Sequence, residues 1–328
     1  MLDQGRADGV FPMAAAWIGL DGEHLATAFT GRASASTQWD LASLTKPMVV
    51  VTAAMRAVAE GHLDLDAEVT EFGGRAVSVA DLLAHRSGYP PWCDFRAAKE
   101  RGEDVEDTLS TARRDGAAVP TTAYSDLGYI HLGRWLAARS GRPLVDHLPP
   151  EVHYPAHARV APTADYAPTG WEDVRGRHLQ GEVHDTNTWA LGGIAGHAGA
   201  FAPIDAVGRW ASDLARAASG RSATIDGDVV RLFWDLQHRD VDSAATWVLG
   251  WDTPSPAAST AGRGASASAV GHLGFTGTSV WIDRDQGLTM VLLSNRVAMP
   301  VPYEASADRL RRFRAVFHDG VRDLTSRS

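Results

Sequence analysis

The sequence predicts an α/β (α+β) fold in which one antiparallel sheet, built from both ends of the chain, is flanked by helices. Two short apolar runs, 13–19 and 25–30, are joined by a segment containing Asp21-Gly22, a dipeptide typical of hairpin turns. Strand patterns return only in the last third, at 247–251, 269–274, 278–283 and 288–294. We therefore expect a discontinuous sheet domain, 1–60 with 203–328, and an inserted, mostly helical and loop-rich domain, 61–202.

Helical patterns fill the middle of the chain and its C-terminal end. The first, 43–60, is apolar almost all round and carries Pro47 in its first turn, as expected for a buried helix. Ser78 followed by Asp81 resembles a capping box that opens a short helix. Further helices are expected at 105–114, 126–139, 204–218 and 303–324. The stretch 144–202 is rich in Gly, Pro and His, and loops of that length usually cover a functional site.

Composition and charge limit the classes of partner. The chain has 328 residues, 45% of them hydrophobic, and a formal net charge of −9, which disfavours nucleic acid or an anionic membrane. The single cysteine, Cys93, cannot form an internal disulfide, and we expect an idle thiol. No basic-then-apolar leader and no membrane-length apolar stretch is visible, so we expect a cytoplasmic protein that does not contact membranes.

The sharpest chemical signal is Ser43-Leu44-Thr45-Lys46. A serine and a lysine three residues apart on a helix share one face, where the amine can take the proton of an attacking hydroxyl. Lys46 and Lys99 are the only lysines among 31 basic residues, and arginine could not replace a lysine as a base. The alternative is a helix-capping serine followed by a solvated lysine, but the buried helix that follows argues against it.

Two further segments supply candidate groups. Tyr124, before a predicted helix, can carry a proton to a leaving group or can be a core tyrosine, and Asp126 can cap that helix. In Gly271-His272-Leu273-Gly274-Phe275-Thr276-Gly277, the glycines permit close backbone approach, and His272 can exchange protons near neutral pH. No nucleophile elbow, zinc-binding pattern or dinucleotide fingerprint is present, so we expect no metal.

These three elements, in this order, resemble the serine β-lactamase and penicillin-binding-protein superfamily, in particular its class C β-lactamase-like esterase branch. Ser43-x-x-Lys46 matches the first motif. Tyr124-x-Asp126 matches the second, with Asp for Asn, and His272-Leu273-Gly274 takes the place of Lys-Thr-Gly. A competing alignment would shift the third motif by three residues, to Thr276-Gly277. The resemblance implies the β-lactamase-like fold over nearly the whole chain and no cofactor.

The resemblance also implies roles. Ser43 would attack a carbonyl, Lys46 and Tyr124 would share the base role, and the backbone N–H groups of Ser43 and Phe275 would form the oxyanion hole. His272 would belong to the catalytic group, and Asp126, Gly274 and Thr276 would contact substrate. His85 and His197 would be structural, each holding loops by hydrogen bonds.

The departures from the family pattern narrow the substrate. Binding of anionic substrates is weakened by three departures: a mostly neutral His272, Leu273 without a hydroxyl, and an added charge at Asp126. Arg296 could still contact a carboxylate. We therefore predict a serine hydrolase, an esterase acting through a Ser43 acyl-enzyme on a small ester or thioester. Three alternatives stay open: an acyltransferase of secondary metabolism, a β-lactamase or D-peptidase acting on an amide, and a non-catalytic binding protein on the same scaffold.

Overall fold

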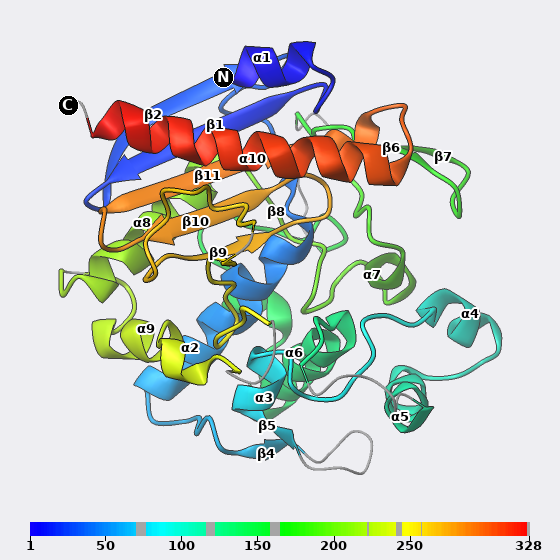
Figure 1. The fold of residues 1–328 in the computed structure, drawn as a ribbon. Helices are drawn as coiled ribbons and strands as arrows, with labels where there is room; N and C mark the ends of the chain where they lie inside the picture. The colour runs from blue at the N-terminus through cyan, green and yellow to red at the C-terminus, as the bar shows by residue number, and fades with distance from the viewer. Residues whose placement is uncertain are drawn as a thin grey trace.

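The structure is a computed structural model that describes residues 1–69, 77–115, 122–157, 165–221, 223–240, 245–256 and 258–326. Its centre is a five-stranded antiparallel sheet in which the N-terminal hairpin is joined to three C-terminal strands (Figure 1). In spatial order the strands are β2 (Glu23–Thr30), β1 (Ala14–Leu20), β11 (Leu288–Ser294), β10 (Ser279–Asp283) and β9 (Val270–Leu273). The sheet therefore draws its strands from both ends of the chain, as the sequence predicted.

The N-terminal hairpin turns where Asp21-Gly22 was expected to turn it. Both residues have positive φ, 51° and 75°, the left-handed conformation that a two-residue hairpin turn with matching twist requires. The next connection across the sheet spans most of the chain, because Ala14 of β1 pairs with Ser294 of β11. The predicted strand 247–251 does not form. That segment makes only isolated bridges at Trp247, Asp252 and Gly271, beside the end strand β9.

Helices cover both faces of the sheet. The long helix α10 (Tyr303–Thr325) and the short α1 (Leu2–Ala7) lie across one face, where Phe11, Trp281 and Phe317 are buried (Figure 1). On the other face, α8 (Ile204–Ala218) packs against β1 and β11, and behind it lie α2 (Thr52–Ala59) and α9 (Gly227–Phe233). The second, larger core lies between these helices and the sheet.

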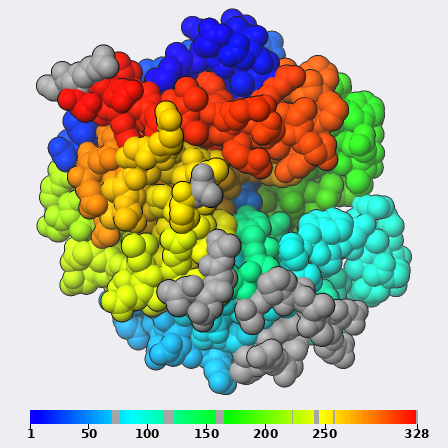
Figure 2. Space-filling view, viewed as in Figure 1, coloured from blue at the N-terminus to red at the C-terminus, as the bar shows by residue number. Residues whose placement is uncertain are grey.

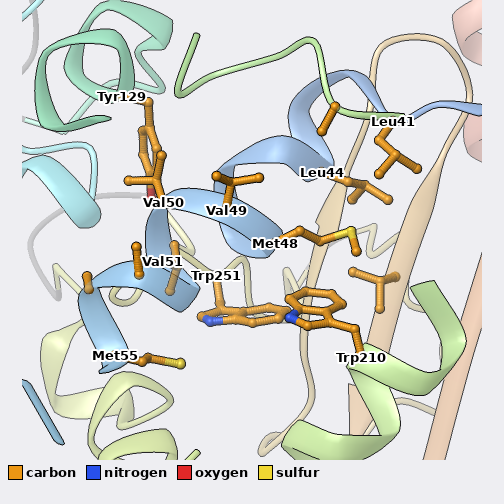
Figure 3. Packing of buried hydrophobic residues seen from close by; sticks show 14 of the residues in the cluster. Leu41, Leu44, Met48, Val49, Val50, Val51, Met55, Tyr129, Trp210 and Trp251 are labelled. Atoms are coloured by element: carbon orange, nitrogen blue, oxygen red, sulfur yellow. The ribbon is translucent and has the colours of Figure 1, made fainter. Parts of the chain in front are cut away.

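The helix predicted at 43–60 is assembled from three kinds of turn. It begins as a 3-10 helix, η1 (Ala42–Leu44), continues as a π-helix, η2 (Lys46–Val51), and ends as α2. Its side chains from Met48 to Val51 are fully buried, and Figure 3 shows them between the ring of Tyr129 and the stacked indoles of Trp210 and Trp251. The packing expected from the apolar sequence is present, and it fixes the end of the helix that carries Ser43 and Lys46.

Among the described residues, the remaining elements are three small strand pairs and a set of mostly short helices. The capping interaction expected at Ser78 is present, since its hydroxyl accepts the N–H of Asp81 at 3.0 Å. The small strand pairs are β3 (Trp39–Asp40) with β8 (Phe201–Ala202), β4 (Glu68–Val69) with β5 (Val77–Ser78), and β6 (Gly170–Glu172) with β7 (Arg177–Leu179). The other helices are α3 (Val79–Leu83), α4 (Phe95–Glu100), α5 (Val105–Asp115), α6 (Asp126–Ser140), η3 (Leu144–His147), α7 (Thr186–Ala190), η4 (Leu236–His238) and η5 (Arg296–Ala298).

Most of the predicted long loop 144–202 lacks long regular elements; its part at 158–164 lies outside the described residues. Figure 2 shows a hollow between the red and orange C-terminal segments and the cyan segments of the middle of the chain, with blue atoms of the N-terminal part at its floor. No helix in the described part of the chain has the length and apolarity that crossing a membrane requires.

Candidate active site

Ser43 lies in a turn whose backbone is held under strain. The residue before it, Ala42, has φ of 46°, a left-handed conformation that is costly for a residue with a Cβ. The buried carboxylate of Asp40 accepts the N–H of Ala42 at 2.8 Å, which stabilises this turn. Ser43 itself is half-buried, so its hydroxyl stands at the end of a rigid, buried helix and remains accessible.

Lys46 is fully buried, and its ammonium group has three hydrogen-bond acceptors besides the neighbouring Tyr124 phenol. The Nζ atom donates to Ser43 Oγ at 3.1 Å, to Asp126 Oδ1 at 2.6 Å and to the carbonyl of His197 at 3.2 Å. Burial disfavours the charge, but the carboxylate of Asp126 and the neighbouring Tyr124 outweigh it, so the pKa of Lys46 is raised. In the resting site the lysine is therefore an ammonium ion whose three N–H groups are all in use.

Tyr124 lies against this ammonium group. Lys46 Nζ is 4.8 Å from the centre of the phenol ring, and the rings of His85 and Trp247 are 4.5 and 5.3 Å from it. Burial raises the pKa of the Tyr124 phenol, although the charge of Lys46 and hydrogen bonds with Lys46 and Ser43 act in the other direction. Both members of the Lys46–Tyr124 pair thus hold their protons at rest.

His272, on β9, completes this cluster from the sheet side. Its ring centre is 6.3 Å from that of Tyr124. The Nδ1 atom is 2.9 Å from the carbonyl of Leu273, which can only accept, so Nδ1 carries the proton and Nε2 is bare. Burial and the charge of Lys46 lower the pKa of His272 to about 3, so this ring is neutral, as the sequence indicated.

The position of Gly274 is consistent with the first of the two alignments of the third motif. A Cβ on Gly274 would lie 2.7 Å from the carbonyl oxygen of Leu41, so glycine is required where this turn meets the turn before Ser43. With Gly274 in this position, His272 is the residue beside Tyr124, and Phe275 follows the motif. The backbone N–H groups of Ser43 and Phe275 have no hydrogen-bond partner among the described residues. Unpaired donors of this kind are what an oxyanion hole requires.

Two residues expected to bind substrate instead hold the site together. Thr276 is buried, and its hydroxyl donates to the carbonyl of Asp40 at 2.7 Å. The N–H of Gly274 donates to the carbonyl of Thr278 at 2.7 Å. Neither of these two donors is therefore free to hydrogen-bond a substrate, and contact between a substrate and Thr276 or Gly274 stays a prediction.

Arg296 contacts the loop that follows Gly274 and contains Phe275. The residue is only 4% exposed, its Nε donates to the carbonyl of Phe275 at 2.9 Å, and its Nη1 donates to Ser306 Oγ at 3.3 Å. The guanidinium carbon lies 4.8 Å from the ring centres of both Phe275 and Tyr303. Arg296, which the sequence indicated as able to contact a carboxylate, therefore packs beneath the loop that carries the Phe275 N–H.

Sequence reasoning missed the role of Asp40. Its Oδ2 accepts the N–H of His184 at 2.7 Å, so this one side chain joins the turn before Ser43 to the loop of His184. Burial raises the pKa of Asp40 to about 6, against the backbone hydrogen bonds that favour its ionised form. These partners are backbone groups distant in the chain, and no spacing in the sequence indicates them.

The histidines expected to be structural make the hydrogen bonds expected of them. His85 Nδ1 accepts the N–H of Ser125 at 3.1 Å, next to Tyr124. The ring of His197 lies 2.9 Å from Asp185 Oδ1, which fixes the loop whose carbonyl accepts from Lys46. Burial raises the pKa of the half-buried Cys93 thiol to about 11, so it stays protonated at neutral pH, as expected of an idle thiol.

Comparisons with known proteins agree with this geometry. The family model described as Beta-lactamase matches residues 1–314. The chain is 28% identical over 310 residues to an N-acetylmuramyl-L-alanine amidase of Bacillus subtilis (strain 168). This alignment covers 81% of this chain and 69% of the relative. It is 26% identical over 314 residues to a putative D-alanyl-D-alanine carboxypeptidase of Escherichia coli (strain K12), covering 82% and 71%.

Solved structures show the same fold at low sequence identity. A class C beta lactamase from Rhodobacter sphaeroides matches with a TM-score of 0.71, 17% identity and 97% coverage of both chains. EstCE1, titled a hydrolase with promiscuous acyltransferase activity, matches with a TM-score of 0.67, 17% identity and 95% coverage of both chains. The family model matches almost the whole length of this chain. The chain therefore belongs to the beta-lactamase family, and it has the fold of the serine β-lactamases and penicillin-binding proteins.

Proposed function

We propose that this member of the family is a serine esterase that forms an acyl-enzyme on Ser43. The observation that carries the proposal is the grouping of Ser43, Lys46 and Tyr124 beside two unpaired backbone N–H groups. Preference for a neutral ester or thioester rests on the neutral His272 and on Arg296, whose Nε and Nη1 donate to Phe275 and Ser306.

The first half of the reaction would transfer the acyl group. Ser43 Oγ bonds to the carbonyl carbon as its proton passes to the Lys46–Tyr124 pair, once that pair has lost one proton to solvent. The carbonyl oxygen becomes an oxyanion that accepts from the N–H groups of Ser43 and Phe275. The bond to the leaving oxygen or sulfur then breaks, and Tyr124 returns the proton to it.

The second half would regenerate the enzyme. Water attacks the acyl carbon and gives a proton to the same pair, and the bond from that carbon to Ser43 Oγ breaks as the oxygen regains a proton. An alcohol or amine in place of water would make the reaction an acyl transfer. The stacked rings of Phe275 and Tyr303, 46% and 52% exposed, border the oxyanion loop and offer apolar surface to such an acceptor.

Rates on a matched set of substrates test the proposal. We expect kcat/KM for a p-nitrophenyl ester and a thioester to exceed that for a chromogenic cephalosporin and for a peptide ending in D-Ala-D-Ala. Ser43→Ala should remove the activity, whereas Ser36→Ala, an exposed serine seven residues earlier, should keep it. Faster turnover of the cephalosporin or the peptide would contradict the ester preference, and added alcohol or amine appearing in the product would identify acyl transfer.

A further inference from the structure

The polar groups that surround Ser43 differ sharply in what they can still bind. The three N–H groups of Lys46 are donated to Ser43, Asp126 and His197, and the guanidinium of Arg296 is held by Phe275 and Ser306. The three N–H groups of Lys46 are therefore taken, and part of the Arg296 guanidinium is engaged as well.

Two hydrogen-bond acceptors near Ser43, on Asp126 and His272, still have unused capacity. Asp126 gives Oδ1 to Lys46, but its Oδ2 makes no hydrogen bond within the described residues, and the side chain is 20% exposed. A carboxylate has about four lone-pair sites, so one contact with Lys46 leaves most of its capacity unused. His272 Nε2 is likewise a bare acceptor, buried at the site without a partner among the described residues.

Asp126 is also held rigidly in place. Its backbone N–H donates to the carbonyl of Pro91 at 3.0 Å, and Ser125 before it caps α6 by accepting the N–H of Gly128 at 3.2 Å. The open oxygen is therefore a fixed feature beside the nucleophile, on the same carboxylate that contacts Lys46.

From this inventory we infer that the site takes acyl groups bearing a protonated amine, with the ammonium group donating to Asp126 Oδ2. The substrate class is an aminoacyl ester or amide with a free amino group. This inference rests on the proposed acyl-enzyme at Ser43 and specifies what that site acylates. A carboxylate in the same place would lie beside the negative charge of Asp126, and like charges in a desolvated cleft repel.

Three p-nitrophenyl esters at pH 6 test the inference. The alanyl ester carries an ammonium group at that pH, the propanoyl ester has nearly the same shape without it, and the hemisuccinyl ester is anionic. The measured quantity is the ratio of kcat/KM for alanyl over propanoyl ester, for both D- and L-alanine, after subtraction of the rate with Ser43→Ala. Comparing this ratio between variants cancels the intrinsic reactivity of each ester.

We expect the ratio to fall at least tenfold in Asp126→Asn, because an amide removes the charge from a charge-assisted hydrogen bond. Asp285→Asn is the matched control, since it makes the same change at an exposed hairpin turn and should leave the ratio unaltered. An unaltered ratio in Asp126→Asn, or a preference for the hemisuccinyl ester, would overturn the inference. If the propanoyl ester acylates Ser43 without an alanyl preference, only this inference fails; if neither ester acylates Ser43, the proposed function fails.

Discussion

At the scale of single residues, the side chain with the largest influence on the site is Asp126, which stands where the second motif of the superfamily has asparagine. Its carboxylate lies 2.6 Å from Lys46 Nζ in a buried environment and favours the ammonium form. Since an ammonium ion cannot accept a proton, the same contact that positions Lys46 also restrains it as a base. The Lys46–Tyr124 pair titrates as a unit, and its base form becomes more populated as the pH rises.

Asp126→Asn should therefore shift the pH dependence of the reaction. Removing the negative charge leaves burial as the main influence on Lys46, so the pKa of the pair falls and the acidic limb of the kcat/KM profile moves to lower pH. The measurement is a pH series with a neutral ester, on the wild type and the variant. An acidic limb that stays in place, or that moves to higher pH, would show that Asp126 does not control the protonation of the pair.

Asp40 is the second residue whose environment has a measurable consequence. Its pKa is raised from 3.8 to about 6, so the folded protein holds this proton more tightly than the unfolded chain. A group of this kind stabilises the fold below the unfolded pKa and loses that contribution as pH rises through the folded value. From pH 4.5 to 7 the loss is about 2 kcal/mol, at about 1.36 kcal/mol per pKa unit.

Asp40→Asn removes this titration. We expect the free energy of unfolding of the wild type, relative to the variant, to fall by about 2 kcal/mol between pH 4.5 and 7, measured by urea denaturation. The variant should also lose part of the backbone hydrogen bonding at Ala42 and His184, which lowers its stability at both pH values and cancels in the comparison. A pH-independent difference would mean that Asp40 ionises normally in the folded protein.

At the scale of elements, close contacts between a helix and the sheet depend on glycine. Gly208 of α8 lies on the indole of Trp17 in β1, and a Cβ there would be 2.3 Å from the ring. Trp17 is 2% exposed and has no room to move aside. Gly320 of α10 would meet only the flexible end of Met1.

The two glycines therefore predict opposite outcomes. Gly208→Ala should destabilise the protein by about 2 kcal/mol, as overpacking of a core does. Gly320→Ala should be neutral or stabilising by up to about 1 kcal/mol, because alanine favours the helix. Thermal or urea unfolding of both variants checks this, and equal effects at the two positions would contradict the packing described for α8.

Some helices and strands could be predicted from the sequence and others could not. The helix 204–218 and the strand 288–294 match α8 and β11 residue for residue, because their apolar spacing is undisturbed by neighbours. The region 247–251 is apolar enough for a strand, yet within it only Trp247 makes a bridge, to Asp252, which in turn bridges Gly271 of β9. Strand pairing depends on what lies beside a segment as well as on its own residues. The 3-10 and π turns around Lys46 left no pattern in the sequence.

At the scale of the whole molecule, the order of the motifs predicted which residues meet, and the contacts decided what each one does. Ser43 and Lys46, Tyr124, and His272 come from three separate parts of the chain and were grouped from sequence. The side chains of Thr276, Lys46 and Arg296 donate to backbone carbonyls far away in the chain, those of Asp40, His197 and Phe275 respectively. Backbone partners carry no residue signature, and so these roles could not be predicted.

The central claim is that Ser43 is the nucleophile of this site, and intact mass spectrometry tests it most directly. The protein is mixed with an activated ester, quenched in acid within seconds, and weighed beside Ser43→Ala and Ser36→Ala. We expect a mass gain of one acyl group in the wild type and in Ser36→Ala, with none in Ser43→Ala. An equal gain in Ser43→Ala, or ester turnover that survives the loss of Ser43, would contradict it.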